Sequence, residues 1–189
     1  MTGPSGPGPA VVLVGPMGVG KSTVGELLAE RLGLGYRDTD ADVVERAGLS
    51  IAEIFIDAGE ARFRELEREA VRLAVAEHTG VLALGGGAIL DDATRALLTG
   101  LPVVFLDVGV TTALKRVGLN APRPLLAVNP RAKWRELMEE RRPLYTEVAR
   151  AVVNTDERTP EAVAEAVLEA LEAAQSPGTN PRISRENHA

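Results

Sequence analysis

The sequence has no cysteine among its 189 residues, few aromatic side chains and no long apolar run. The absence of cysteine excludes disulfides, thiolate metal sites and a cysteine nucleophile. Aromatic residues make up 3% of the chain and hydrophobic residues of all kinds 45%, so the core has to be built from Val, Leu, Ile and Ala. Such a core is typical of buried parallel strands that are covered by helices.

Charge and hydropathy exclude further classes of protein. The formal net charge of −6 argues against nucleic acid or an anionic membrane as the main partner. No apolar run approaches the roughly 20 residues that a membrane span needs. Residues 1–9 have neither the basic start nor the apolar stretch of a signal peptide. We therefore expect a cytoplasmic enzyme with no nucleic-acid or membrane partner.

The pattern along the chain predicts one domain, residues 10–174, between disordered tails at 1–9 and 175–189 that are rich in Gly, Pro, Ser and Asn. Short apolar runs alternate with helical patterns in this domain. Because parallel strands need helical crossovers, we expect an α/β fold of three layers, α/β/α, with a five-stranded parallel sheet. The predicted strands are 10–14, 35–38, 81–84, 103–106 and 152–154. Helices are expected from 21, after 40, from 50 to near 59, around 63–74, and from about 91, 111, 130 and 160.

The strongest motif is the stretch from Gly15 to Ser22, which matches G-x-x-x-x-G-K-[ST] in full between an apolar strand and an amphipathic helix. Glycines let the backbone fold around phosphates with its N–H groups inward, and the helix beginning at Lys21 adds its positive end. Lys21 would reach the β- and γ-phosphates, and the Ser22 hydroxyl would ligate Mg²⁺. The alternative, a glycine-rich turn that matches by chance, is disfavoured because both flanks are correct.

Two acids, Asp38 and Asp40, follow the second predicted strand, and ligands of open α/β sheets bind beyond the carboxyl ends of strands. Asp38 could complete a Mg²⁺ shell, and Asp40 could accept the proton of an attacking hydroxyl or hydrogen-bond the substrate. Alternatively, Asp40 is a helix N-cap. Asp107, at the end of strand 103–106, is a rival metal carboxylate. The bare pattern leaves Asp107 and Asp38 comparable.

A glycine triplet and one arginine are further candidates. Gly85, Gly86 and Gly87 follow a buried strand and would let a ligand approach the backbone closely, although a flexible turn is the alternative. Arg141 lies seven residues after Trp134, on the helix face that also carries Leu137 and Met138. A guanidinium among buried apolar residues needs a partner. Arg141 is therefore either in a structural ion pair or a clamp for an anionic substrate.

Arg123 lies between two prolines in an irregular stretch at about 118–128, which we expect to form a mobile lid loop. A stiffly held arginine there could move over the phosphates when the loop closes; the alternative is an ordinary surface arginine.

One predicted helix carries four arginines, at positions 62, 64, 68 and 72. Arg64 has Glu60 at i−4 and Glu67 at i+3, so surface ion pairing is the simplest account of it. Sequence reasoning does not choose among the four.

Taken in order, these motifs resemble the shikimate kinase family over roughly residues 10–172. The matching stretches are 15–23, the paired acids at 38–40, 59–67 (GEARFRELE), 84–88 (LGGGA), 123–126 (RPLL) and 141–145 (RRPLY). The resemblance implies a P-loop kinase fold and transfer of the γ-phosphoryl group of MgATP to the 3-hydroxyl of shikimate, in the pathway to chorismate and the aromatic amino acids. It also implies that the glycine-triplet strand is next to the phosphate-loop strand, which disfavours Asp107.

The resemblance assigns a role to each matching residue. The metal, Mg²⁺, would be held by Ser22 and Asp38, and the catalytic residues would be Lys21, Asp40 and Arg123. Shikimate would be bound by Asp40, Arg64, Gly86, Gly87 and Arg141, with the two arginines on its carboxylate. The nucleotide would be bound by Gly15, Met17, Gly18, Val19, Gly20, Lys21, Ser22, Thr23, Arg116, Arg123, Arg158 and Pro160.

Two other functions remain alternatives at this point. One is a related small-molecule kinase, such as a gluconate kinase or a nucleotide kinase. The other is a non-catalytic nucleotide-binding module that regulates a partner. The paired acids and Arg123 argue against the second, because such a module would be expected to lose them. For the enzyme we expect a monomer whose partners are ATP and shikimate.

Overall fold

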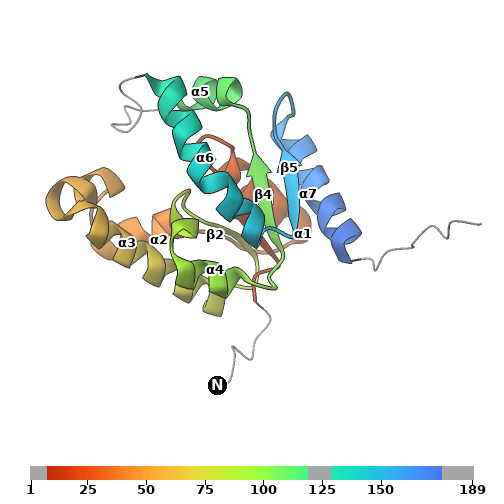
Figure 1. Cartoon of the computed structure of the whole chain (residues 1–189). Coiled ribbons are helices and arrows are strands. Elements are labelled where there is room, and N and C mark those ends of the chain that lie inside the picture. Colours follow the sequence, from red (N-terminus) through yellow and green to blue (C-terminus); the bar gives the residue numbers. More distant parts are fainter. Residues whose placement is uncertain (1–7, 119–128, 176–189) are drawn as a thin grey trace, which may run out of the picture.

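The computed structural model describes residues 8–118 and 129–175, and Figure 1 shows how its elements are arranged. Five parallel strands form one sheet in the order β2-β3-β1-β4-β5. Their bounds are Val11–Val14 (β1), Tyr36–Asp38 (β2), Val81–Ala83 (β3), Val103–Asp107 (β4) and Ala151–Asn154 (β5). The predicted α/β fold with a five-stranded parallel sheet is confirmed. The predicted lid residue Arg123 lies outside the described residues.

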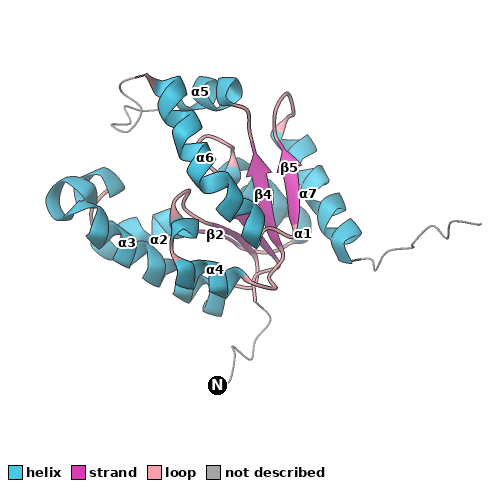
Figure 2. Ribbon diagram, in the orientation of Figure 1, coloured by secondary structure: helices cyan, strands magenta, loops and turns pink. Residues whose placement is uncertain are grey.

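Helices lie on both faces of the sheet (Figure 2). Helix α1 packs beside α7, whereas α6 packs against β4. The bounds are Lys21–Leu32 (α1), Thr39–Ala47 (α2), Ile51–Glu77 (α3), Ala88–Leu90 (a 3₁₀ turn, η1), Asp92–Leu98 (α4), Val110–Gly118 (α5), Pro130–Val148 (α6) and Pro160–Gln175 (α7). No helix in the described part of the chain has the length and apolarity that a membrane crossing requires.

The longest helix, α3, is kinked, and the kink lies where the sequence predicts a break. Its start agrees with the prediction of a helix from 50: Ser50 and Glu53 form a capping box, with the Glu53 N–H donating to Ser50 Oγ and the Ser50 N–H donating to Glu53 Oε2. Gly59 has non-helical dihedral angles, a φ of 81° and a ψ of 172°, so the helix that begins at Ile51 breaks there as predicted, and a second helical stretch continues across the kink to Glu77. Glycine tolerates a positive φ without the Cβ clash that other residues meet, so the chain can bend between the two helical stretches.

The central strand β1 brings the candidate residues to one edge of the sheet. Leu13 of β1 pairs with Ala83 of β3 on one side and with Val104 of β4 on the other. All three strands are almost fully buried, as expected for apolar parallel strands that are covered on both faces. Because parallel strands end at the same edge, the phosphate loop, the glycine triplet and Asp107 all follow the carboxyl ends of neighbouring strands.

Candidate active site

The phosphate loop has the backbone that its glycines predict. A Cβ at Gly15 would lie 2.5 Å from the carbonyl oxygen of Leu106, so no side chain fits there. Gly20 has a φ of 98° and is the N-cap of α1, where no side chain caps the first turn. The ammonium group of Lys21 donates to the carbonyl oxygens of Gly15 at 2.7 Å and Pro16 at 3.0 Å. The helix start therefore directs its N–H groups, and Lys21 its charge, to one anion-binding loop.

A pocket of about 350 Å³ lies beside this loop and contains the residues predicted for the adenine side of the nucleotide. It is lined by Val19, Gly20, Thr23, Val24, Arg116, Thr155, Arg158, Pro160 and Val163. The Arg116 guanidinium donates to the Val19 carbonyl oxygen and to both Oγ1 and the carbonyl oxygen of Thr155, each at 3.1 Å. Thr155, which is buried, was missed by sequence reasoning, because nothing in the pattern marks a threonine after an edge strand.

Asp38 lies beside Ser22 and also caps helix α2. Its Oδ2 is 3.4 Å from Ser22 Oγ and accepts a hydrogen bond from the Tyr36 hydroxyl at 3.2 Å. Its Oδ1 accepts from the Asp40 N–H at 2.9 Å. The helix N-cap is therefore Asp38, and the alternative that Asp40 caps this helix is wrong. Burial raises the pKa of Tyr36, so this hydroxyl stays protonated and can donate.

The rival carboxylate, Asp107, is held elsewhere. Its strand β4 lies directly beside β1, as β3 does, so strand order alone does not exclude it. However, Asp107 Oδ1 accepts from the Val108 N–H at 2.8 Å, and Oδ2 forms an ion pair with Arg142. These contacts give Asp107 a structural role and leave Asp38 as the carboxylate beside Ser22.

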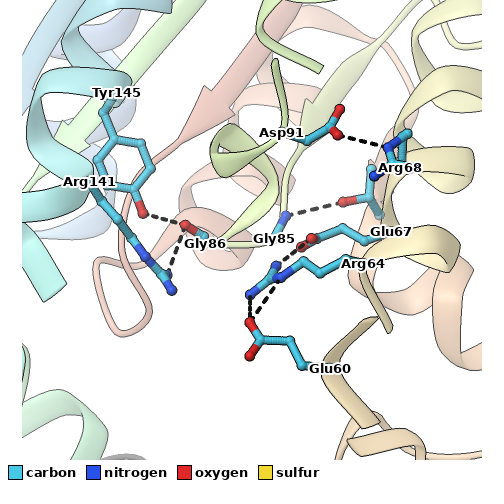
Figure 3. A network of polar contacts seen from close by, with 10 residues as sticks. Glu60, Arg64, Glu67, Arg68, Gly85, Gly86, Asp91, Arg141 and Tyr145 are labelled. Atoms are coloured by element: carbon cyan, nitrogen blue, oxygen red, sulfur yellow. Dashed lines mark hydrogen bonds and ion pairs between the residues drawn. The ribbon is translucent and has the colours of Figure 1, made fainter. Parts of the chain in front are cut away.

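The glycine triplet forms a tight turn that contacts α2, α3 and α6. Figure 3 shows Gly85 and Gly86 between the labelled side chains of α3 and α6. The Gly85 N–H donates to Oγ1 of the fully buried Thr39 at 3.1 Å. A Cβ at Gly85 would meet the Asp40 carboxylate and would lie 2.8 Å from Glu67 Oε1. Two carboxylates therefore face the turn, and they could do so only if position 85 has no side chain. The flexible-turn alternative does not account for these contacts.

Of the four arginines on α3, Arg64 is the one that faces the turn. Its side chain is 23% exposed, whereas those of Arg62, Arg68 and Arg72 are 55%, 49% and 54% exposed and form other ion pairs. Arg64 pairs with Glu67, whose side chain is 4% exposed, and more distantly with the exposed Glu60 at 3.4 Å. Both ion pairs that the helical spacing indicates are therefore formed, but Glu67 lies in the interior and not at the surface.

Glu67 brings a carboxylate into the interior beside this arginine. Burial raises the pKa of Glu67, and the neighbouring guanidinium of Arg64 opposes that shift. Sequence reasoning missed Glu67 as a site residue, since helical spacing alone does not show which face of α3 meets the glycine turn.

Arg141 comes from the opposite side, on α6. Its Nη1 donates to the Gly86 carbonyl oxygen at 3.2 Å, and the Tyr145 hydroxyl donates to the same oxygen at 2.5 Å (Figure 3). Arg141 belongs to none of the ion pairs between described residues, and its Nε is buried without a hydrogen-bond partner among them. The structural ion pair that we had considered is thus not formed within the described part of the chain.

The glycine turn also packs against the phosphate loop. A Cβ at Gly86 would lie 3.4 Å from the Met17 nitrogen and 3.5 Å from the Gly15 carbonyl oxygen. The guanidinium groups of Arg64 and Arg141 therefore lie beside the phosphate loop. This arrangement suits phosphoryl transfer from a nucleotide to a second anionic molecule.

Comparison with known proteins agrees with this geometry. The shikimate kinase family model matches residues 17–172. A shikimate kinase from Streptomyces coelicolor is 71% identical over 164 residues, which cover 87% of this chain and 96% of the relative. A solved structure of shikimate kinase from Acinetobacter baumannii in complex with shikimate superposes with a TM-score of 0.83 at 38% identity, covering 88% of this chain and 94% of that one.

A gluconokinase from Sinorhizobium meliloti 1021 superposes less well, with a TM-score of 0.51 at 19% identity over 88% of this chain and 93% of that one. That likeness shows a common fold and gives no support to the gluconate alternative. The family model covers most of the chain and includes both sides of the site. The chain belongs to the shikimate kinase family.

Proposed function

We propose that this chain transfers the γ-phosphoryl group of MgATP to the 3-hydroxyl of shikimate, giving ADP and shikimate 3-phosphate. One observation carries the proposal. Arg64 on α3 and Arg141 on α6 approach one glycine turn from opposite sides, and that turn lies against the phosphate loop. Paired guanidinium groups bind a carboxylate well, so the acceptor is an acidic alcohol that is held next to the nucleotide's terminal phosphate.

For this reaction the protein mainly has to align the two substrates and neutralise negative charge. Phosphoryl transfer passes through a transition state whose charge is spread over the phosphoryl oxygens, and catalysis is mostly positioning and electrostatic stabilisation. The N–H groups at the start of α1 and the Lys21 ammonium would stabilise that charge. Arg116, Arg158 and Pro160 would bound the adenine side of the nucleotide. Arg123 would add a further positive charge from the lid, and this role stays a prediction.

The residues present fit Mg²⁺. Ser22 Oγ and Asp38 Oδ2 lie 3.4 Å apart at the phosphate loop, and hard oxygen donors are the ligands that Mg²⁺ prefers. In the part of the chain that the structure describes, no three His, Cys, Asp or Glu side chains gather into a metal-binding group. Ser22 and Asp38 would thus hold the ion together with phosphate oxygens and water. The bound ion would neutralise phosphate charge.

Asp40 is the residue that we propose acts on the acceptor hydroxyl. It is the second residue of α2, two residues after Asp38, and its carboxylate faces Gly85 in the turn that Arg64 and Arg141 flank. A carboxylate there can accept a hydrogen bond from a hydroxyl and orient its oxygen for in-line attack, or accept its proton. We propose that Asp40 contacts the hydroxyl that becomes phosphorylated.

A coupled assay of ADP release tests the proposal. We expect saturable turnover with shikimate and only background ADP release with gluconate or with nucleoside monophosphates. Turnover with gluconate or a nucleoside monophosphate at a comparable kcat/KM would reject shikimate as the acceptor. ADP release with none of them, despite measurable ATP binding, would favour the regulatory module instead.

A monomeric state and a cytoplasmic location complete the proposal. Multi-angle light scattering of the purified chain, with and without ATP and shikimate, tests the first. A dimer that persists on dilution would overturn it. Fractionation of the source cells tests the second.

A further inference from the structure

The peptide group between Gly86 and Gly87 is anchored by its carbonyl oxygen. The Tyr145 hydroxyl donates to the Gly86 oxygen at 2.5 Å, and Arg141 Nη1 donates to it at 3.2 Å. Both donors come from α6, one helical turn apart (Figure 3). A trans peptide is planar, so its N–H points opposite to its carbonyl. Holding the oxygen toward α6 therefore directs the Gly87 N–H away from α6, into the turn that Arg64 faces.

The orientation of this peptide group has to be fixed by hydrogen bonds, because the two residues that it joins, Gly86 and Gly87, are both glycine. Without a Cβ on either side, rotation of the peptide plane meets little steric resistance. The flanking hydrogen bonds, from Ala88 N–H to the Gly85 oxygen at 3.1 Å and from Leu90 N–H to the Gly87 oxygen at 3.0 Å, leave the 86–87 peptide itself unfixed. In the rotated state a carbonyl oxygen, instead of an N–H, would face an anionic substrate.

The side chain of Tyr145 is held rigidly, so its hydroxyl can fix the position of the Gly86 carbonyl. It is fully buried and its ring stacks on Phe105 with centroids 4.9 Å apart. Burial raises the pKa of Tyr145 to about 12, so the hydroxyl keeps its proton at any physiological pH and remains a donor. Arg141, by contrast, is half-buried and is expected to engage the substrate, so it does not serve the carbonyl alone.

We propose that Tyr145 is a positioning residue for the acceptor substrate: its hydroxyl holds the Gly86–Gly87 peptide so that the Gly87 N–H donates to the substrate's carboxylate. The inference rests on the proposed function, because it requires shikimate to bind at the glycine turn. Tyr145 itself touches neither the substrate nor the nucleotide in this scheme. Its effect passes through one backbone amide.

The Tyr145→Phe variant removes the hydroxyl and keeps the ring that stacks on Phe105. Loss of a hydrogen bond to this partly buried carbonyl is expected to raise the KM for shikimate roughly 5- to 30-fold, with the KM for ATP changed by less than about twofold. The matched control is Phe105→Leu, which loosens the same packing but leaves the hydroxyl on the Gly86 oxygen. It is expected to lower the thermal midpoint without a selective rise in the KM for shikimate.

A binding measurement separates positioning from packing without relying on turnover. In protein labelled with ¹⁵N-glycine, the Gly87 amide of the unsubstituted chain should give one resonance that shifts when shikimate is added. In Tyr145→Phe the free protein should show that resonance broadened or doubled, as expected for a peptide that populates two orientations, and titration should give a weaker Kd.

The outcomes distinguish this inference from the proposed function. If the Gly87 amide of the unsubstituted chain does not respond to shikimate, the proposed binding site and the role of Tyr145 both fail. If it responds, yet Tyr145→Phe binds shikimate with an unchanged Kd, only the role of Tyr145 is overturned. An equal rise in the KM for shikimate in Phe105→Leu would also overturn it, because packing alone would then explain the effect.

Discussion

The guanidinium of Arg64 occupies the space that a side chain at Gly87 would fill. A Cβ at position 87 would lie 2.6 Å from Arg64 Nη2 and 2.8 Å from its Cζ, although the two residues come from different elements, α3 and the turn after β3. Arg64 therefore reaches the turn only because residue 87 has no side chain. The contact places one of the two proposed carboxylate-binding charges directly on the backbone that lies against the phosphate loop.

Gly87→Ala is predicted to impair shikimate binding with little loss of stability. The backbone at 87, with φ −101° and ψ −3°, accepts an alanine, and the group that must move is the flexible end of Arg64. A displaced guanidinium is expected to raise the KM for shikimate about 10-fold or more. Steady-state kinetics and a thermal melt of the same sample measure both quantities.

A double-mutant cycle gives the control for that prediction. In an Arg64→Ala background, Gly87→Ala has no guanidinium to displace and should add less than about twofold to the KM for shikimate. Full additivity of the two substitutions would show that the alanine methyl acts on the substrate or the backbone, and not through Arg64.

Arg141→Ala is predicted to weaken shikimate binding far more than nucleotide binding. Its removal leaves a carboxylate without one of its two charged donors, which corresponds to roughly a 10- to 100-fold rise in the KM for shikimate. The KM for ATP should change by less than about threefold. The neighbouring Arg142→Ala is the matched control, because Arg142 pairs with Asp107 at the surface and should affect neither value by more than about twofold. Equal effects of the two substitutions would remove Arg141 from the site.

Lys21→Ala is predicted to abolish most turnover while the fold stays intact. The ammonium group lies on the phosphate loop and does not contribute to the hydrophobic core, so the thermal midpoint should change little. Removing one charged donor to the transition state is expected to lower kcat by about 10²-fold or more. A kcat within a few-fold of the unsubstituted chain would contradict the assignment of the phosphate loop.

Glu67→Gln is predicted to change how stability depends on pH. Burial raises the pKa of Glu67 above its ordinary value of 4.5, so the folded chain holds this proton more tightly than the unfolded chain. Between pH 4.5 and the folded pKa, the unfolded state loses its proton first, and the free energy of unfolding falls as pH rises. Glutamine does not titrate, so this decline should be absent in the variant.

Urea unfolding of both proteins between pH 4 and pH 7.5 measures that difference. We expect the free energy of unfolding of Glu67→Gln, relative to the unsubstituted chain, to increase as the pH rises above 4.5. The opposite trend would mean that the Arg64 guanidinium outweighs burial and lowers the pKa of this carboxyl.

Local sequence determined the parts of this protein that depend on neighbouring residues. The apolar strand before Gly15 and the helix after Lys21 predicted the phosphate loop, and the alternation of strands and helices predicted the parallel sheet. The helix starts at Ser50 and Pro130 were also predicted. These features follow from backbone conformation and helical or strand periodicity, which a short stretch of sequence encodes completely.

Tertiary structure alone decided the contacts between distant segments. It placed the buried Glu67 beside Arg64 and paired Asp107 with Arg142, although the family resemblance already favours Arg64 and disfavours Asp107. It also showed that Asp38, and not Asp40, caps α2, and that Tyr145 holds the glycine turn. Periodicity tells which residues share a face of a helix. The strand or turn that this face contacts depends on the order of the strands and on how helices from both ends of the chain pack on the sheet. A single segment of sequence does not contain that information.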